Sequence, residues 1–260
     1  MALDLEGENV LVTGASSGIG TACAEGFAAL GCRLMLVARR KNRLVTLAKA
    51  LHGQHGVDVL TEALDVRDRR AVENWVKDLG KDWRDIDILV NNAGLARGLA
   101  PLHEGAIEDW EEMIDTNIKG LLYVTRAVLP GMVERGHGHV INIGSIAGHE
   151  VYPGGNVYCA SKHAVTALNR ALCIDTLGTG VRVSSVDPGM VETEFSLVRF
   201  HGDAERADGV YQGLQPLRGE DVAEAVVFCA TRRANANVRE LVLMPSAQAT
   251  AVHAFRSEEV

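Results

Sequence analysis

The 260-residue sequence lacks the features by which several protein classes are recognised. It has no apolar run of the roughly 18 residues that a membrane-spanning helix needs. The N-terminal stretch Met1–Gly7 has neither a basic flank nor an apolar core, so we expect no signal peptide. Acidic residues outnumber basic ones by 34 to 26, and the net charge of -8 argues against nucleic acid or an anionic membrane as a partner.

Cysteine is also scarce, which bears on redox chemistry and on metal binding. The cysteines number five and are scattered, and no pair has the spacing of metal ligands. They are Cys23, Cys32, Cys159, Cys173 and Cys229. This pattern predicts reduced thiols, a cytoplasmic location and no metal site. With 47% hydrophobic residues, the chain is long enough for one large domain with a generous core.

Short apolar segments alternate with helical patterns along the whole chain. Strands are expected at 10–12, 34–38, 57–64, 86–90, 139–143, 181–186 and 238–243. Helices are expected up to Gly31, at 41–51, at 68–79, at 107–134 with an interruption near Pro130, from Tyr158 to about 177, and at 221–231. This alternation predicts an α/β fold: a single-domain, Rossmann-type, doubly wound parallel sheet with helices on both faces, spanning residues 1–260.

One connection in this pattern is much longer than the others. The residues from Pro188 to Arg218 separate a strand from the next clear helix, whereas ordinary connections in such folds have about 2–6 residues. Because the segment follows the carboxyl end of a strand, it lies on the face where doubly wound sheets bind ligands. We expect a substrate lid at about 188–218.

Three glycines follow the first strand in the pattern Gly-x-x-x-Gly-x-Gly: Gly14, Gly18 and Gly20. Glycine at these points permits a tight turn, close approach of the backbone to phosphate oxygens and packing of the helix on the strand. The unpaired N–H groups of the helix N-terminus then attract a pyrophosphate. The location in the first strand–helix unit favours nucleotide binding over the alternative, a glycine-rich structural turn.

The end of the second strand indicates which nucleotide binds. An acidic residue at this place would bind the ribose hydroxyls and repel a 2′-phosphate. The chain has Ala38, Arg39 and Arg40 instead, and its next carboxylate is Asp58. Arginine is suited to bidentate phosphate binding, so NADP(H) is favoured over NAD(H). The alternative is that Arg39 and Arg40 are only solvated loop residues.

Tyr158 and Lys162 are four residues apart, so a helix places both side chains on one face. A phenol titrates near pH ~10, and a catalytic tyrosine must be tuned toward neutrality. Lowering its pKa by about 3 units takes roughly 4 kcal/mol. A cation about 4 Å away, at an effective dielectric of about 20, supplies roughly that amount. We therefore expect Lys162 alone to suffice, although such a pair also occurs by chance in many helices.

Taken together, the motifs identify a family. The chain resembles a short-chain dehydrogenase/reductase over nearly its whole length. The matching positions, in order, are Thr13 to Gly20, Asp65, Val66, Asn91, Asn92, Ala93, Gly94, Asn117, Ser145, Tyr158, Lys162, Pro188 and Gly189.

The resemblance implies a role for each of these residues. Tyr158 would exchange the proton with the substrate oxygen, Ser145 would hydrogen-bond that oxygen, and Lys162 would tune Tyr158 and hold the nicotinamide ribose. Asn117 would hold a water that links Lys162 to solvent, and Asn91 would stabilise the central strand. The implied NADP(H) contacts are Gly14, Ser16, Ser17, Gly18, Ile19, Gly20, Arg39, Arg40, Asp65, Val66, Asn92, Tyr158, Lys162, Pro188, Gly189, Val191 and Thr193.

Within that family the chain is similar to NADP-dependent 3-hydroxy acid dehydrogenases. The similarity lies in residues 92–98, 109–138 and 193–200, and it implies a small-molecule substrate such as serine, L-allo-threonine or 3-hydroxypropionate. A substrate carboxylate would then be received by Arg199, or by Arg97, unless these side chains are solvated or pair with Glu192 or Glu194. The alternatives are a carbonyl reductase for another substrate class, a non-catalytic NADP(H) sensor, and a methyltransferase.

Two helices carry more apolar residues than one buried face needs, among them Leu121, Leu122, Val165 and Leu168. The resemblance implies that the helix at 107–134 and the helix of Tyr158 pair across a twofold axis. The C-terminal strand would form a second contact, which gives a homotetramer. The alternative is that these residues all pack on the protein's own sheet.

Overall fold

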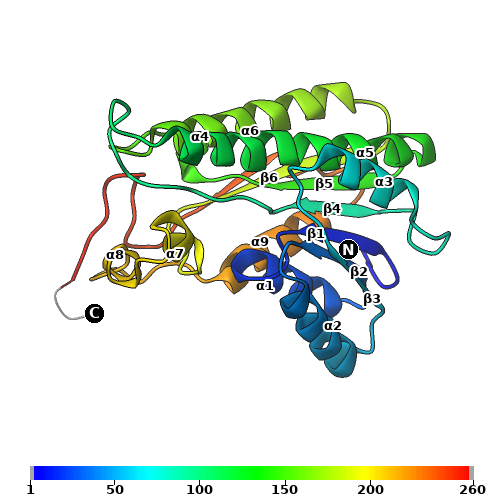
Figure 1. The fold of residues 1–260 in the computed structure, drawn as a ribbon. Coiled ribbons are helices and arrows are strands. Elements are labelled where there is room, and N and C mark those ends of the chain that lie inside the picture. The colour runs from blue at the N-terminus through cyan, green and yellow to red at the C-terminus, as the bar shows by residue number, and fades with distance from the viewer. Residues whose placement is uncertain (1–2, 258–260) are drawn as a thin grey trace.

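A computed structural model describes residues 3–257, so Met1, Ala2 and residues 258–260 lie outside it. Its strands form one parallel sheet in the order β3-β2-β1-β4-β5-β6-β7 (Figure 1). They are β1 Asn9–Thr13, β2 Arg33–Ala38, β3 Val59–Ala63, β4 Ile88–Asn91, β5 Gly138–Ile143, β6 Val181–Pro188 and β7 Glu240–Leu243. The chain reverses direction across the sheet between β1 and β4, which opens a crevice at the carboxyl ends of these strands. The predicted doubly wound parallel sheet is confirmed.

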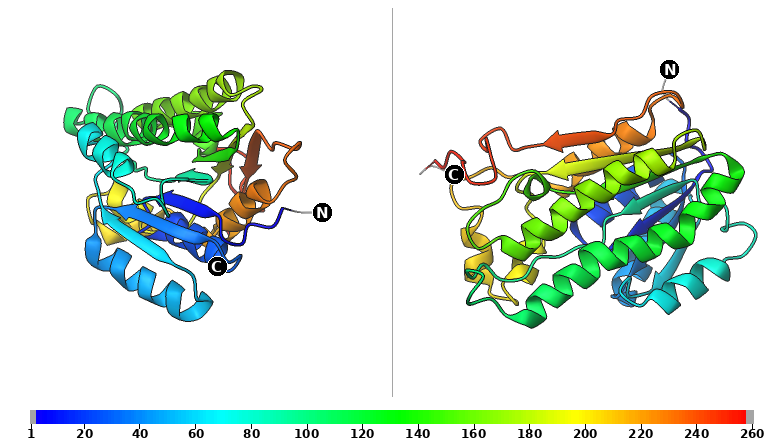
Figure 2. Two further views of the ribbon diagram at one scale, coloured as in Figure 1. Left: turned by 90° about the vertical axis from the view of Figure 1, so that its right-hand side faces the viewer. Right: turned by 90° about the horizontal axis from the view of Figure 1, so that it is seen from above.

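Helices cover both faces of the sheet (Figures 1 and 2). One face carries α1 Gly18–Ala28, α2 Lys41–His55 and α9 Gly219–Ala230, and the other carries α3 Arg69–Lys77, α4 Ile107–Ile114, α5 Leu121–Arg135 and α6 Asn156–Asp175. Successive strand residues serve opposite faces. Val10 and Val12 share a core with Phe27 of α1, while Leu11 shares the other core with Val128 of α5. Burial on both faces explains the continuous apolar runs of the central strands.

The long helix expected at 107–134 is interrupted, but the predicted place near Pro130 is wrong. The irregularity is a π-helical segment, η1 Asp115–Gly120, between α4 and α5. Pro130 lies inside α5, which continues to Arg135. Proline removes one backbone hydrogen bond, which a helix packed along its length tolerates here. The π-helical segment contains Asn117, and such widened turns are frequent at functional sites.

The element ends otherwise lie close to their predicted positions. The largest helix difference is at α2, which continues to His55 instead of 51 and ends where Gly56 adopts φ 72°. Glycine takes up this left-handed conformation without strain, so it ends the helix. The strand expected at 57–64 is shorter, Val59–Ala63.

The segment expected to be a lid contains two short helices, α7 Phe195–Arg199 and α8 Ala204–Gly209. It lies beyond the carboxyl end of β6, beside the C-terminal stretch of the chain (Figure 2). The backbone N–H of Met190 donates to Gln248 Oε1 at 2.8 Å, and Ser257 N donates to Gly213 O at 2.8 Å. Among residues 3–257, no helix has both the length and the apolar character to cross a membrane.

Candidate active site

The glycine-rich loop between β1 and α1 brings the backbone unusually close to its neighbours. A Cβ on Gly14 would lie 2.8 Å from Asn92 Nδ2, and one on Gly20 would lie 2.5 Å from the same atom. A Cβ on Gly18 would lie 3.0 Å from the Cβ of Thr193. Gly14 and Gly18 also have positive φ angles, +67° and +53°. The loop therefore forms a cradle that fits the pyrophosphate of a dinucleotide.

Three adjoining cavities, of about 180, 200 and 270 Å³, follow the carboxyl ends of the strands. The cavity of 180 Å³ lies between the other two and shares lining residues with both. The predicted residues that line it are Gly14, Ser17, Gly18, Ile19, Asn92, Ser145, Tyr158, Lys162, Pro188, Gly189, Val191 and Thr193. The cavity of 200 Å³ is lined by Gly14, Ser16, Ser17, Arg39, Arg40, Asp65 and Val66. Gly20 and Asn117 line none of these cavities: Gly20 lies beneath the loop, and Asn117 lies behind Gly94.

The two arginines after β2 have different surroundings. Arg40 donates to Ser16 Oγ at 3.1 Å, to Ser17 Oγ at 2.7 Å and to Glu194 Oε2 at 2.7 Å. Arg39 is more exposed, and its Nη1 is 3.7 Å from Glu112 Oε1. The alternative that both are only solvated is wrong for Arg40, which joins the serines of the loop to Glu194 in the segment at 188–218.

Asp65 is paired with a residue that the sequence reasoning missed. Arg67 donates to both carboxylate oxygens of Asp65, at 3.0 Å and 2.6 Å. Burial alone would raise the pKa of Asp65, but the hydrogen bonds from Arg67 outweigh burial and hold this pKa below its ordinary value. The available signal was the position of Arg67, two residues after Asp65. Glu112 and Arg43 also belong to this end of the cleft and were not expected there, and Glu194 pairs with Arg40 and Arg43 rather than with the arginines considered for it.

Tyr158 and Ser145 line both the cavity of 180 Å³ and the cavity of 270 Å³, and Lys162 lines the first of these. Ser145 follows β5, and its hydroxyl acts to lower the pKa of Tyr158. The Tyr158 ring packs edge-on against Phe195 of α7, with 5.6 Å between the ring centroids. Lys162 Nζ donates to the carbonyl of Ile143 at 2.9 Å and is 6.0 Å from the Tyr158 ring centroid.

The prediction that Lys162 alone lowers the pKa of Tyr158 is wrong. Burial, and next to it Tyr152, raise the pKa of Tyr158 above its ordinary value, against the lowering effects of Ser145 and Arg199. Burial also lowers the pKa of Lys162 to about 8, although the charge of Asp187 opposes this. Burial therefore favours the neutral form of both side chains more than water does.

The side chains of Asn117 and Asn91 form hydrogen bonds that hold elements of the fold together. Asn117 Oδ1 accepts from Leu95 N at 2.9 Å, and its Nδ2 donates to Leu95 O at 2.8 Å and to Ser161 Oγ at 2.9 Å. Asn91 Nδ2 donates to Thr125 Oγ1 and to Asn142 Oδ1, which joins β4 to α5 and β5. The role of Asn117 in holding a water stays a prediction.

The largest of the three cavities contains one of the two candidate anion-binding arginines. Arg199 lines it together with Tyr152, Tyr211 and Gln248, and its guanidinium donates to Tyr152 Oη at 3.0 Å. Among the described residues it makes no ion pair, so the alternative pairing with Glu192 or Glu194 is wrong.

Arg97 lies behind the wall of this cavity. It pairs with Glu112 at 2.7 Å and donates to the carbonyl of Val198. Only Arg199 therefore faces the side of the cleft where Tyr158 and Ser145 lie.

A second group of ionisable residues lies at the amino ends of the strands, away from the cleft. The ligand atoms of Glu8, Asp87 and His137 are within 4.8 Å of one another. Arg135 Nη2 is 3.9 Å from Asp87, so a cation already faces this group.

Comparisons with known proteins agree with this geometry. The family model for short chain dehydrogenases matches residues 8–202. The chain is 51% identical over 243 residues to the NADP-dependent 3-hydroxy acid dehydrogenase YdfG of Salmonella typhi, which covers 93% of this chain and 96% of the relative. It is 48% identical over 241 residues to sulfoacetaldehyde reductase 2 of Chromohalobacter salexigens, with 92% and 95% covered. The closed form of serine dehydrogenase complexed with NADP+ matches with a TM-score of 0.89 and 47% identity, covering 96% and 100%.

Proposed function

The chain belongs to the short-chain dehydrogenase family, and from that premise we propose that it interconverts a small 3-hydroxy acid and the corresponding carbonyl compound with NADP(H). One observation carries the proposal for the substrate: Arg199, which forms no ion pair within residues 3–257, lines the same cavity as Tyr158 and Ser145. A substrate whose alcohol carbon is near Tyr158 would have an anionic group within reach of this guanidinium.

The chain's own residues would move the proton. Tyr158 gives its phenolic proton to the substrate oxygen during reduction and takes the alcohol proton during oxidation. Ser145, which lines the same cavities as Tyr158, would hold the same oxygen. NADP(H), when bound, supplies or accepts the hydride. Lys162 would add positive charge beside the phenol and would hold the nicotinamide ribose, and Asn117 would connect Lys162 to solvent.

The cofactor is NADP(H), as for the similar proteins whose names state it. Arg39 and Arg40 line the end of the cleft where a 2′-phosphate would lie, and no carboxylate stands at the end of β2 in place of them. Each guanidinium can donate two hydrogen bonds to a phosphate. Asp65 and Val66 border the same cavity and would contact the adenine.

The relatives favour an anionic substrate but differ in the anion. One is named for 3-hydroxy acids, one for serine and one for sulfoacetaldehyde. A guanidinium binds carboxylate and sulfonate oxygens with the same fork of N–H donors. A sulfonate-bearing aldehyde is therefore the second candidate substrate.

The test is a substrate panel followed at the nicotinamide absorbance band. L-serine, L-allo-threonine, 3-hydroxypropionate and sulfoacetaldehyde are compared with neutral amides or esters of the acids. A charged hydrogen bond to Arg199 should favour the acid by about tenfold or more. Arg199→Met should remove this preference, while Arg206→Met, an exposed arginine of α8, should leave it unchanged. Equal rates on acid and amide in the wild type would refute the anion site and leave the oxidoreductase standing.

We also propose that the protein is a cytoplasmic homotetramer. The five cysteines are all free thiols, and four of them are buried, which suits a reducing compartment. Apolar side chains remain exposed on α5 and α6, and β7 forms an unpaired edge of the sheet. Both surfaces are suited to contacts between copies of the chain.

A further inference from the structure

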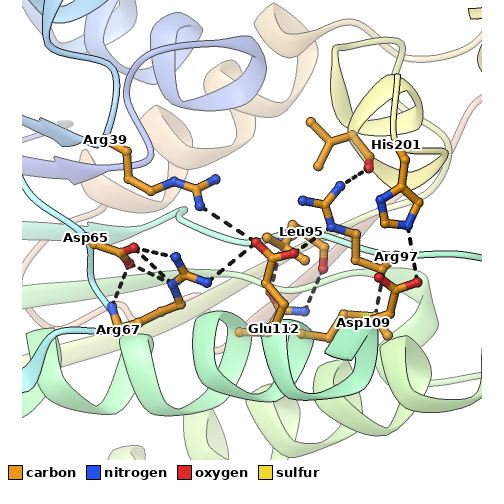
Figure 3. Close-up of polar contacts among 11 residues, drawn as sticks. Arg39, Asp65, Arg67, Leu95, Arg97, Asp109, Glu112 and His201 are labelled. Carbon is orange, nitrogen blue, oxygen red and sulfur yellow. Dashed lines mark hydrogen bonds and ion pairs between the residues drawn. The ribbon is translucent and has the colours of Figure 1, made fainter. Parts of the chain in front are cut away.

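Glu112 of α4 lies between Arg97 on one side and Arg39 and Arg67 on the other, so that three arginines surround its carboxylate (Figure 3). Arg97 Nε donates to Oε2 at 2.7 Å. Arg67 Nη1 and Arg39 Nη1 approach Oε1 at 3.6 and 3.7 Å. Glu112 is 21% exposed and Arg97 17%, so this pair is screened less by solvent than an ordinary surface pair.

On one side of Glu112, the contacts of Arg97 lead to the substrate lid at 188–218. Its guanidinium donates to the carbonyl of Val198, in α7. The next residue, Gly98, donates its N–H to Arg199 O at 2.9 Å and accepts from Arg199 Nε at 3.0 Å. The Arg97–Gly98 stretch therefore holds the last turn of α7, the helix that carries Arg199. Glu112 in turn holds the Arg97 side chain that makes the first of these bonds.

On the other side of Glu112, Arg39 and Arg67 lead to the cavity of 200 Å³, where the adenosine part of the cofactor would lie. Arg39 lines that cavity, and Arg67 is bound to Asp65, which also lines it. Their distances to Glu112 are too long for hydrogen bonds, so these two pairs are looser than the pair with Arg97. Burial would raise the pKa of Glu112, but the hydrogen bond from Arg97 and the charges of Arg97, Arg67 and Arg39 outweigh burial and lower it. Glu112 therefore carries its charge at neutral pH.

We propose that Glu112 is a positioning residue that couples the cofactor's 2′-phosphate to the substrate lid, by sharing Arg39 and Arg67 with the phosphate and Arg97 with α7. This rests on the proposed function, in which Arg39 meets the phosphate. A bound phosphate draws Arg39 and Arg67 away from Glu112. The Glu112 carboxylate then pairs with Arg97 alone, and Arg97 holds α7 more firmly. By linkage, a substrate that needs α7 in place favours the phosphorylated cofactor by the same factor.

Two substitutions distinguish the effect of Glu112 on Arg39 and Arg67 from its effect on Arg97. In Glu112→Gln, Arg39 and Arg67 lose a competing carboxylate, so NADP+ should bind about threefold tighter, while NAD+ affinity stays unchanged. The same variant weakens the hold on Arg97, so the substrate KM should rise about threefold or more. In Arg97→Leu, Glu112 is left to Arg39 and Arg67 alone, so NADP+ should bind more weakly while the substrate KM again rises.

The control is Glu111→Gln, the same change at the neighbouring, exposed position of α4. Cofactor affinities are measured by titration of each purified full-length variant, and substrate KM at saturating NADP+. Opposite shifts of NADP+ affinity and substrate KM in Glu112→Gln support the coupling, because a general loosening of the fold would weaken both ligands. Weaker binding of both ligands in that variant, or values equal to those of Glu111→Gln, would overturn it. If the proposed function fails instead, the wild type itself binds NADP+ and NAD+ equally.

Discussion

Burial works against the charged forms of the two side chains at the centre of the site. Lys162 is enclosed and its pKa falls to about 8 from an ordinary 10.5, while the pKa of Tyr158 rises. The expectation that Lys162 tunes Tyr158 left out the desolvation of each group, which is the largest effect on both. Such a site is built at the expense of stability, as is common where catalysis needs a buried charge.

The first prediction is that Lys162→Met stabilises the protein when no cofactor is added. The unfolded chain keeps its lysine protonated up to pH 10.5, whereas the folded protein loses that proton near pH 8. The wild-type free energy of unfolding therefore rises between these pH values, and below them the buried charge is unfavourable. At pH 7 the variant should gain about 1–3 kcal/mol by urea unfolding, and this gain should shrink by pH 10.

Lys49→Met is the matched control, because Lys49 is an exposed lysine of α2. It should change the free energy of unfolding by less than about 0.5 kcal/mol at either pH. A Lys162→Met protein less stable than the wild type at pH 7 would mean that the hydrogen bond to Ile143 outweighs the desolvation of the ammonium.

The second prediction concerns Tyr158 and the direction of the reaction. Because burial raises its pKa, the phenol is protonated at neutral pH and ready to donate in carbonyl reduction. Alcohol oxidation needs the phenolate, so its rate should increase with pH while reduction stays level near neutrality. Tyr158→Phe should keep cofactor binding but lose about 10²–10⁴ of turnover in both directions. Turnover within about tenfold of wild type would show that another group moves the proton.

At the scale of elements, the sequence predicted those features of the fold that residues close together in the chain determine. The apolar runs of β1, β2 and β5 and the glycines after β1 gave both the sheet and the nucleotide loop. The long helix was expected to be interrupted near Pro130, whereas the irregularity is the π-helical segment Asp115–Gly120. Gly120 packs so closely on Val66 that a Cβ would lie 2.7 Å from the Val66 side chain. That contact joins residues far apart in the chain, which a helical pattern does not reveal.

The third prediction compares two helical glycines. Gly20→Ala in α1 would put a Cβ 2.5 Å from the carbonyl oxygen of Gly14 and from Asn92, and should destabilise the protein by about 1–3 kcal/mol and weaken NADP+ binding. Gly53→Ala in α2 meets nothing within 4 Å and should stabilise it by about 0.5–1 kcal/mol. Thermal unfolding measures both. Equal shifts would mean that close packing of the loop is not what requires Gly20.

At the scale of the whole molecule, the candidate site was only partly visible in the sequence. Tyr158, Lys162 and the glycines belong to strand–turn–helix units whose spacing reveals them. The carboxylates that hold the arginines were not visible, because their partners come from distant segments. Glu112 meets Arg39, Arg67 and Arg97, and Glu194 meets Arg40 and Arg43, only once the lid and the helices are placed around the sheet.

The outer surface of the helix layer bears on the assembly. Leu121 and Val165 are buried within the chain, so these two are not available for contacts between copies. Leu122 stays 41% exposed and Ile174 of α6 stays 74% exposed. On the edge strand β7, Val242 is 48% exposed. These apolar side chains leave two separate faces for contacts between copies, which a tetramer with two kinds of twofold contact requires.

The last prediction is that light scattering finds four copies of the chain at micromolar concentration and that Leu122→Glu reduces the assembly to dimers. Across a twofold axis the substitution appears on both sides, so two charges replace two apolar contacts worth about 1.5–3 kcal/mol each. Leu30→Glu is the control, since Leu30 is 37% exposed but lies beside α1, on the other face of the sheet. A wild-type monomer, or a tetramer that tolerates Leu122→Glu as well as Leu30→Glu, would show that the face of α5 and α6 is not an interface.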